Sequence, residues 1–310
     1  WAAVRALLDG EHVARRVSGE LALLGAEASL RMGDPDAARR ALPDAIALCE
    51  RTGSRTHLRR AVNLLGAAHF EKGDIDGAAA AFSRALELAN ADGDALLVAR
   101  ATNNLGAIAN LRGRRDEALG LYQLAIPAYQ QIGSAVGLAQ SFHNIAITCR
   151  DNHQLDRADE YERRAIEFAR EAENQRLIAM ARAGRAELCL LRGDARLAEV
   201  GAMRASIEYA GIPDPGGEAD ALRLVGAARA MRGALGDALS ALDRAVALAA
   251  KHGSALVEAE ALRSRAEVHV LGGAPDRART DARCALEIFT RLGADEERGV
   301  VEELLARIGG

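Results

Sequence analysis

Aromatic residues, lysine, cysteine and proline are all scarce in this chain of 310 residues. Aromatic side chains make up only 3% of it, so a core must be built mainly from alanine, leucine and valine, which belong to the 49% hydrophobic fraction. No uninterrupted apolar stretch reaches the roughly 18 residues that a membrane span needs. The formal net charge is −4, so no excess of positive charge attracts phosphates or an anionic membrane surface. These absences exclude nonspecific nucleic-acid binding and a membrane protein, and favour a soluble, compact one.

The few cysteines lie far apart and form no C-x-x-C pair. This spacing disfavours a zinc site or a redox dithiol and predicts reduced cysteines in a core, which favours a cytoplasmic location. The four cysteines are Cys49, Cys149, Cys189 and Cys284. The chain starts at Trp1 without a methionine, so we interpret it as a fragment or a processed piece. The preference for arginine over lysine, together with abundant alanine, indicates a bacterial source.

A repeat of 40 residues runs through the sequence, and no insertion interrupts it across seven units. One position of the repeat lies between two stretches of helical character and is almost always glycine. It comprises Gly33, Gly73, Gly113, His153, Gly193, Gly233 and Gly273. Three further positions hold only alanine or glycine in every unit, beginning with Ala26, Ala38 and Ala45. Chance cannot plausibly fill such columns, so each unit is predicted to be a copy of one structure.

Each unit is predicted to form two antiparallel helices. In the second unit the pattern predicts helices over residues 56–72 and 75–90, joined by a turn at Gly73, where glycine supplies the left-handed conformation that ends a helix. Alanine or glycine where the paired helices cross lets their axes approach to about 8–10 Å. Larger residues such as Phe82 and Tyr122 then fill the adjoining grooves. Since no unit can bury both of its faces alone, neighbouring units must stack on one another.

The second and third units resemble the tetratricopeptide repeat. The resemblance rests on Leu65-Gly66 with Gly73, Ala78, Phe82 and Ala85, and on Leu105-Gly106 with Gly113, Ala118, Tyr122 and Ala125. The longer period is similar to that of LGN/Pins scaffolds, kinesin light chains and the sensor regions of bacterial multidomain regulators. The resemblance implies an all-α fold, a right-handed superhelical solenoid of antiparallel helix pairs. It departs from the family in lacking the family's tryptophan and closing proline, and in losing the aromatic residue in units four, five and seven.

The repeat also predicts where the array begins and ends. Residues 1–18 are expected to be the remnant of a preceding helix and a linker, residues 19–298 the seven units, and residues 299–310 the C-terminal part of a capping helix with solvated carboxylates. Residues 209–217 contain two prolines and two adjacent glycines, which predicts an irregular link between units five and six, either a long turn or a hinge. Pro43 and Pro127 lie inside second helices and are expected to bend them.

Catalytic and cofactor motifs are absent from the sequence. It contains no H-E-x-x-H, no G-x-S-x-G and no G-x-x-x-x-G-K. His69 and His269 share a repeat position with Cys149 and Cys189, which predicts core histidines and no metal ligands. Adjacent carboxylates such as Glu296 and Glu297 point about 100° apart on a helix, which favours solvation over acid–base pairing. We therefore expect no enzyme, no cofactor and no bound metal.

Polar side chains recur on one face of the first helices, which in the tetratricopeptide fold line the concave surface. They are Arg60 and Asn63 in unit two, Arg100, Asn103 and Asn104 in unit three, and Gln140, His143 and Asn144 in unit four. An amide offers a donor and an acceptor to a peptide backbone, and an arginine can bind a carboxylate. In the LGN and kinesin-light-chain relatives this face clamps partner peptides, and Asn104 and Asn144 match that motif position. The alternative is that these two asparagines bridge adjacent first helices and touch no ligand.

These patterns predict a scaffold or sensor that binds a protein or an extended peptide in its groove, as part of a larger multidomain bacterial regulator. Acidic residues flank the central units, with Glu20 and Glu27 before them and Glu187, Asp220 and Glu260 after them. A polar-to-basic trough between acidic ends favours a partner with an acidic segment. Two alternatives stay open: an intramolecular module that packs against and controls a missing N-terminal effector domain, and a structural module that self-associates through its ends.

Overall fold

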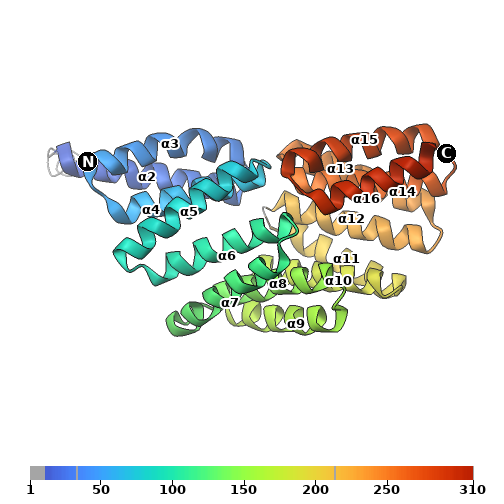
Figure 1. The fold of residues 1–310 in the computed structure, drawn as a ribbon, viewed down its shortest axis with the longest axis horizontal. Helices are drawn as coiled ribbons and strands as arrows, with labels where there is room; N and C mark the ends of the chain where they lie inside the picture. Colours follow the sequence, from blue (N-terminus) through green and yellow to red (C-terminus); the bar gives the residue numbers. More distant parts are fainter. Residues whose placement is uncertain (1–10, 33, 213, 310) are drawn as a thin grey trace. The chain divides into compact units, whose positions relative to one another are not determined.

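The computed structural model describes residues 11–32, 34–212 and 214–309, and all regular secondary structure in these ranges is helical (Figure 1). None of the helices in these ranges is both long enough and apolar enough to cross a membrane. The fifteen helices are α2 (Glu11–Arg31), α3 (Pro35–Thr52), α4 (Arg55–Glu71), α5 (Ile75–Asp92), α6 (Ala95–Leu111), α7 (Arg115–Ile132), α8 (Ala135–Asp151), α9 (Leu155–Glu171), α10 (Gln175–Leu191), α11 (Ala195–Ala210), α12 (Pro215–Met231), α13 (Leu235–His252), α14 (Ala255–Leu271), α15 (Pro275–Leu292) and α16 (Asp295–Gly309).

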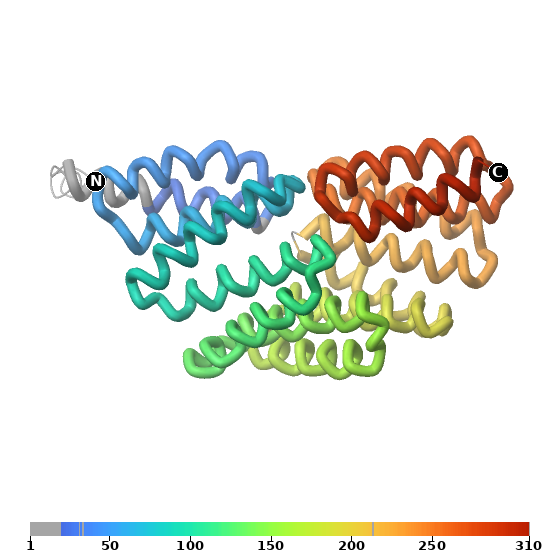
Figure 2. The backbone as a smooth tube through the Cα atoms, in the orientation of Figure 1, coloured from blue at the N-terminus to red at the C-terminus, as the bar shows by residue number. Residues whose placement is uncertain are grey.

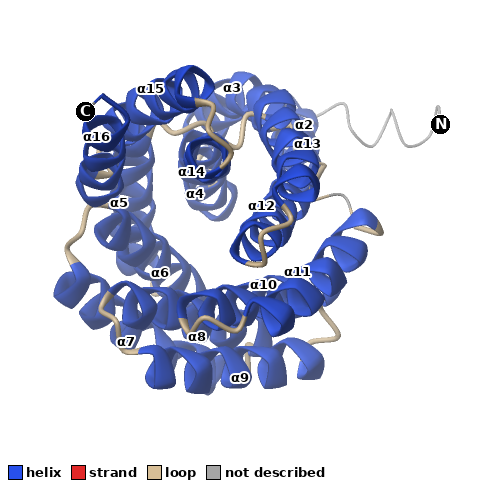
Figure 3. Cartoon of the chain, turned by 90° about the vertical axis from the view of Figure 1, so that its right-hand side faces the viewer, coloured by secondary structure: helices blue, strands red, loops and turns tan. Residues whose placement is uncertain are grey.

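The chain also divides into two larger compact parts, each made of several 40-residue repeats. They are called unit 1, up to Ala101, and unit 2, from Thr102, and are distinct from the seven repeats. In unit 1, successive helices from α2 to α5 pack on one another, and α2 also contacts α4. In unit 2, successive helices from α7 to α16 pack as consecutive hairpins (Figure 2), and α8, α10, α12, α14 and α16 also each contact the next member of this series. The helices α8, α10, α12 and α14 therefore form an inner layer of unit 2, with α9, α11, α13 and α15 outside it (Figure 3). This confirms the predicted stack of antiparallel helix pairs.

The turns between paired helices have the backbone that the repeated glycine predicts. Gly73 and Gly113 adopt φ values of 75° and 71°. His153, which replaces glycine at this position in the fourth repeat, has a φ of 57°, so the turn is kept although the residue has a side chain. At the start of α5, the Asp74 carboxylate accepts a hydrogen bond from the Gly77 amide at 3.0 Å and caps the helix.

The small residues of the first helices make room for rings of the second helices. A Cβ atom at Gly66 would lie 2.6 Å from Phe82 Cδ1, and one at Gly106 would lie 2.5 Å from Tyr122 Cε1. Both rings are buried, so neither can move into solvent to admit a methyl group. Each ring lies against bare backbone, which explains why these two repeats have glycine at this position.

Two helix bounds differ from the expected ones. The first described helix, α2, begins at Glu11, within the residues expected to form the remnant and linker; residues 1–10 lie outside the described part of the chain. The predicted irregular link over residues 209–217 is shorter, because α11 continues to Ala210 and α12 already begins at Pro215. Pro215 occupies the first turn of α12, where its missing N–H is not needed. Pro43 and Pro127 lie inside α3 and α7, as predicted.

Two expectations about individual side chains are also corrected. Cys49 and Cys149 are buried, as predicted, but Cys284 on α15 is exposed, and Cys189 is intermediate between the two. Glu297 on α16 is half-buried, and burial raises its pKa, so it is not a solvated end group; its neighbour Glu296 is exposed as expected, and it also forms an ion pair with Arg115 at the start of α7. Unit 2 is therefore curved enough to bring α16 into contact with the start of α7.

Candidate functional site

In unit 1, three of the predicted groove residues lie on α4 and α6. Arg60 is exposed, and its Nη2 lies 3.5 Å from Glu27 Oε2 on α2. The Oδ1 atom of Asn63 is buried and accepts no hydrogen bond from the described residues. Arg100 is exposed near the middle of α6. Unit 1 thus presents two solvent-accessible guanidinium groups and one amide oxygen that is not used within the fold.

Two predicted groove residues of unit 2 are buried in the helix stack and form hydrogen bonds there. Asn103 on α6 is 4% exposed, and its Oδ1 accepts a hydrogen bond from Ser141 Oγ on α8 at 2.9 Å. His143 on α8 is 8% exposed, and its Nδ1 lies 2.9 Å from Glu162 Oε1 on α9. The repeat spacing predicts that these side chains lie on an open surface. In the structure they connect one helix to the next instead, because Ser141 faces Asn103 and Glu162 faces His143.

Three other predicted residues of unit 2 keep free amide groups. Asn104 on α6 and Gln140 and Asn144 on α8 are half-buried. Within the described residues their side-chain amides have no hydrogen-bond partner. The helix-bridging role that was the alternative for Asn104 and Asn144 is performed by Asn103. It is also performed by Asn110, whose Nδ2 donates to Asp151 Oδ2 at 3.0 Å.

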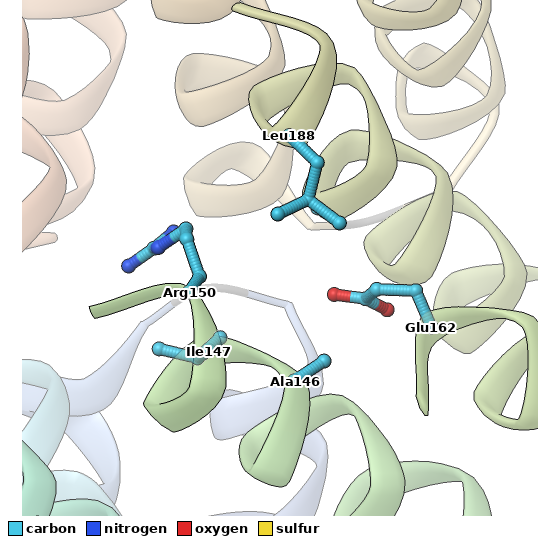
Figure 4. A pocket seen from close by; sticks show the side chains of 6 residues that line it. Ala146, Ile147, Arg150, Glu162 and Leu188 are labelled. Carbon is cyan, nitrogen blue, oxygen red and sulfur yellow. The ribbon is translucent and has the colours of Figure 1, made fainter. Parts of the chain in front are cut away.

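The partner of His143 lies beside a small cavity between α8, α9 and α10. In Figure 4 the Glu162 carboxylate and the Leu188 side chain point into this space, whose lining comprises Ala146, Ile147, Arg150, Glu162, Gly184 and Leu188. A Cβ atom at Gly184 would lie 2.1 Å from Glu162 Oε1, so the carboxylate rests on the backbone of α10. Burial raises the pKa of Glu162, although His143 acts in the opposite direction. The His143–Glu162 pair thus fastens three helices together.

A set of charged side chains crosses the inner layer of unit 2, and we call it the inner charge cluster. It consists of Arg150 on α8, Glu187 on α10, Asp220 and Arg223 on α12, and Glu260 on α14. Arg223 is at its centre with a side chain only 6% exposed. Its Nη2 lies 2.9 Å from Glu187 Oε1, and its Nε lies 2.8 Å from Asp220 Oδ1 and 3.5 Å from Glu260 Oε2. Glu187 also forms an ion pair with Arg150, so charge pairs link four consecutive inner helices.

The pKa values of the two glutamates of the cluster are shifted in opposite directions. Burial alone would raise the pKa of Glu187, but the charges of Arg150 and Arg223 outweigh it and lower the pKa to about 2. Burial also raises the pKa of Glu260, to about 7, because Arg223 offsets only part of it and the carboxylates of Asp220 and Glu187 add to it. Arg223 is shared among three carboxylates, so it cannot keep all of them ionised equally well.

The cluster changes the interpretation of the acidic residues that follow the central repeats. Glu187, Asp220 and Glu260 are not a free acidic surface, because two arginines neutralise most of their charge. The sequence contained a signal for these pairs: Arg150 and Glu187 are 37 residues apart, and Glu187 and Arg223 are 36 apart. Both separations are slightly less than one repeat, so each side chain reaches the next inner helix.

We expect replacement of Glu260 by glutamine to flatten the pH dependence of stability. The folded protein holds the Glu260 proton up to about pH 7, whereas an unfolded glutamate loses it near pH 4.5. The contribution of this group to stability therefore falls as the pH rises through that window, and glutamine removes the loss. Chemical denaturation should show a gain of about 1–3 kcal/mol for Glu260→Gln at pH 8 and little change at pH 4.5. The exposed Glu267→Gln on the same helix is the matched control, and equal pH slopes for all three proteins would contradict the expectation.

Metal ligation has no support in the described ranges, where no three His, Cys, Asp or Glu side chains are arranged to hold an ion. His269 is buried 3.7 Å from Asp281, and His69 Nδ1 lies 2.6 Å from Asp74 Oδ2. Each of these two histidines thus lies beside a single carboxylate.

A family model described as a tetratricopeptide repeat matches residues 21–91 and 97–171. The matched segments begin within α2 and end with α9, so they cover four helix pairs of the stack. None of the curated proteins matches the chain in sequence.

Several solved structures have the same architecture at low sequence identity. NprR in complex with its cognate peptide NprX is 14% identical, with a TM-score of 0.62 over 91% of this chain and 82% of that one. Rap protein complexed with Competence and Sporulation Factor is 14% identical, with a TM-score of 0.58 over 94% of this chain and 98% of that one. A signal transduction ATPase with a tetratricopeptide repeat sensor from Pyrococcus horikoshii is 14% identical, with a TM-score of 0.58 over 86% of this chain and 42% of that one. These likenesses concern the fold.

Proposed function

Because the chain is a tetratricopeptide-repeat protein, we propose that it binds an extended peptide, or an extended segment of a protein, on α6 and α8 of unit 2. The observation that carries the proposal is the set of half-buried amides at Asn104, Gln140 and Asn144, which have no partner within the described residues. Partly desolvated amides that are not paired inside the fold favour a ligand with its own donors and acceptors.

The positions of these amides suit a peptide backbone. Gln140 and Asn144 are four residues apart on α8 and so share one face of the helix. Asn104 occupies the position of Asn144 one repeat earlier, and adjacent packed helices lie about 8–10 Å apart. An extended chain advances about 3.3 Å per residue, so the two asparagines would meet peptide groups about three residues apart. Two proteins with this fold have structures with a bound partner, NprR with its cognate peptide NprX and Rap protein with Competence and Sporulation Factor, which supports the same use of the fold here.

Unit 1, taken by itself, carries exposed arginines that favour an acidic partner. Arg100 has no ion pair among the described residues, and Arg60 makes one long contact, to Glu27. Guanidinium groups bind carboxylates with two parallel hydrogen bonds. We therefore propose that unit 1 binds an acidic segment of a partner, and unchanged affinity for an acidic peptide after charge reversal at Arg60 and Arg100 would contradict this preference.

Selection from a random peptide library on the wild-type protein tests the proposal. We expect selected peptides to bind Asn104→Ala/Gln140→Ala/Asn144→Ala at least about 10-fold more weakly, since each lost hydrogen bond costs about 0.5–1.5 kcal/mol. The outer-face variant Arg244→Ala is the control and should bind like wild type, and both variants must melt cooperatively at the wild-type temperature. Peptides that bind the triple variant as tightly as wild type would refute the site.

We also propose that the repeats act as a sensor within a longer regulatory chain. The likeness to the sensor of the signal transduction ATPase supports this role, since this chain corresponds to 42% of that protein. In a longer product that contains these repeats, the triple amide variant should abolish the response to the selected peptide and leave the resting activity unchanged. A response that survives in this variant would separate peptide binding from regulation.

A further inference from the structure

The outer helix α11 of unit 2 has a continuous apolar stripe that faces solvent. Leu197, Val200, Met203 and Ile207 are 62%, 68%, 42% and 70% exposed. Their separations of three, three and four residues place them on one face of the helix. Scattered exposed apolar residues are ordinary on protein surfaces, but four large ones aligned on a single helix are not.

The repeat itself supplies the comparison that makes this stripe unusual. One repeat earlier, α9 carries Arg157, Glu160, Arg163 and Glu167 at the same positions, all exposed. One repeat later, α13 carries Asp237, Ser240, Asp243 and Ala247, and α15 carries Arg277, Thr280, Arg283 and Glu287. These helices show that the positions tolerate charged or small residues in the same stack.

The stripe has no role in the core of its own repeat. The opposite side of α11 already buries Ala198, Ala202, Ala205 and Tyr209, at the positions that are also buried in the neighbouring outer helices. Exposed apolar area adds nothing to the stability of the isolated fold, whereas it is the material of interaction sites. The stripe is therefore available to a partner.

The charges around the stripe indicate what kind of partner fits. Arg196 is exposed and forms no ion pair in the part of the chain that the structure describes. Arg204 is 68% exposed and pairs with Glu208 at 3.3 Å. The two acidic residues of α11 are engaged: Glu199 faces Arg229 and Arg232, and Glu208 faces Arg182 and Arg204. The exposed charge beside the stripe is therefore positive.

We propose that the apolar stripe of α11 is a docking site for an amphipathic helix whose apolar face is flanked by acidic residues. The apolar side chains of such a helix would pack along Leu197, Val200, Met203 and Ile207, and its carboxylates would meet Arg196 and Arg204. A second copy of this chain fits less well, because two α11 helices would bring the same two arginines against each other. One helix face also provides fewer contacts than the roughly 20–30 residues a side of a stable dimer.

The structure suggests a matched variant, here named the α9-graft. It combines Leu197→Arg, Val200→Glu, Met203→Arg and Ile207→Glu, so that α11 acquires the side chains that α9 already carries at these positions. The net charge is unchanged, and the substituted residues are good helix formers. The control is Ser240→Glu/Ala247→Arg at the equivalent positions of α13.

Two synthetic helical peptides serve as probes, and fluorescence anisotropy with the full chain measures their binding. Both peptides carry leucine at i, i+3, i+7 and i+10; one has glutamate beside this stripe and the other lysine. We expect the glutamate peptide to bind wild type and the α13 control at least about 10-fold more tightly than it binds the α9-graft. Arg196→Glu/Arg204→Glu should reverse the preference between the two peptides, because the attraction is electrostatic as well as apolar.

Three outcomes would overturn the proposal. The peptides could bind wild type and the α9-graft equally, the lysine peptide could bind as well as the glutamate peptide, or neither could bind. Sedimentation velocity on the same proteins examines the second copy as occupant: a wild-type dimer that the α9-graft abolishes would assign the stripe to self-association. The site is independent of the peptide face on α6 and α8, so Asn104→Ala/Gln140→Ala/Asn144→Ala should bind these probes like wild type.

Discussion

Replacing Arg223 with methionine should lower the free energy of unfolding by about 3–5 kcal/mol at pH 8. Arg223 is buried and lies within 3.5 Å of carboxylate oxygens from Glu187, Asp220 and Glu260. Methionine fills a similar volume but leaves these carboxylates close together without the charge that compensates them. Urea denaturation of both proteins at equal ionic strength measures the difference.

The size of this loss should depend on pH. Lowering the pH allows the unpaired carboxylates to bind protons, so the difference between Arg223→Met and wild type should shrink towards pH 5. Arg244→Met on α13 is the control, since Arg244 is exposed and its replacement should change stability by less than about 0.5 kcal/mol. A loss for Arg223→Met that is no larger than for Arg244→Met would show that the cluster does not hold the inner helices together.

Replacing Gly137 with alanine should destabilise the protein by about 1–3 kcal/mol, although alanine is normally the better helix former. A Cβ atom at Gly137 would lie 2.2 Å from Cδ1 of Tyr129, a ring that is 1% exposed and cannot swing out. The α7–α8 contact would have to open to admit the methyl group. The melting temperature and the urea midpoint both report this change.

The same substitution at Gly120 should act in the opposite direction. Gly120 lies inside α7, and an added Cβ would meet nothing within 4 Å. Gly120→Ala should therefore stabilise the helix by about 0.5–1 kcal/mol, because alanine loses less backbone conformational entropy on folding than glycine does. If both variants gained stability, the close approach of Tyr129 to α8 would be disproved.

The helices could be predicted from the sequence because their signals are local and repeated. Helices were expected over residues 56–72 and 75–90, and α4 and α5 occupy Arg55–Glu71 and Ile75–Asp92. Where one repeat lacks a signal, the same position in the neighbouring repeats still shows it. The turn at His153 could therefore be predicted although this repeat has no glycine there. The start of α2 could not be predicted in the same way, since this helix begins at Glu11, within the residues expected to form the remnant and linker.

The use of each polar side chain could not be predicted in the same way. Asn103 and Asn104 are adjacent and have the same chemistry, yet only Asn103 meets a partner, Ser141 on the next inner helix. Consecutive residues of a helix point about 100° apart, so only Asn103 faces Ser141 closely enough to accept its hydrogen bond. The stripe on α11 differs from the fold signals in that no repeated pattern predicts it: Leu197 stands where the preceding outer helix has Arg157, so the stripe is a departure from the repeat at outward positions.

The inner charge cluster also restricts how this array can change in length. Deleting residues 175–214 would remove α10, α11 and one whole period, and the remaining helices would keep their spacing. Ala227 of α12 would then take the place of Glu187, and Arg150 and Arg223 would lose the carboxylate that they share. The repeats in this part of the chain are thus not interchangeable copies. If a repeat here were duplicated or lost, new charge pairs would be needed between the inner helices, so the number of repeats depends on which repeats are neighbours.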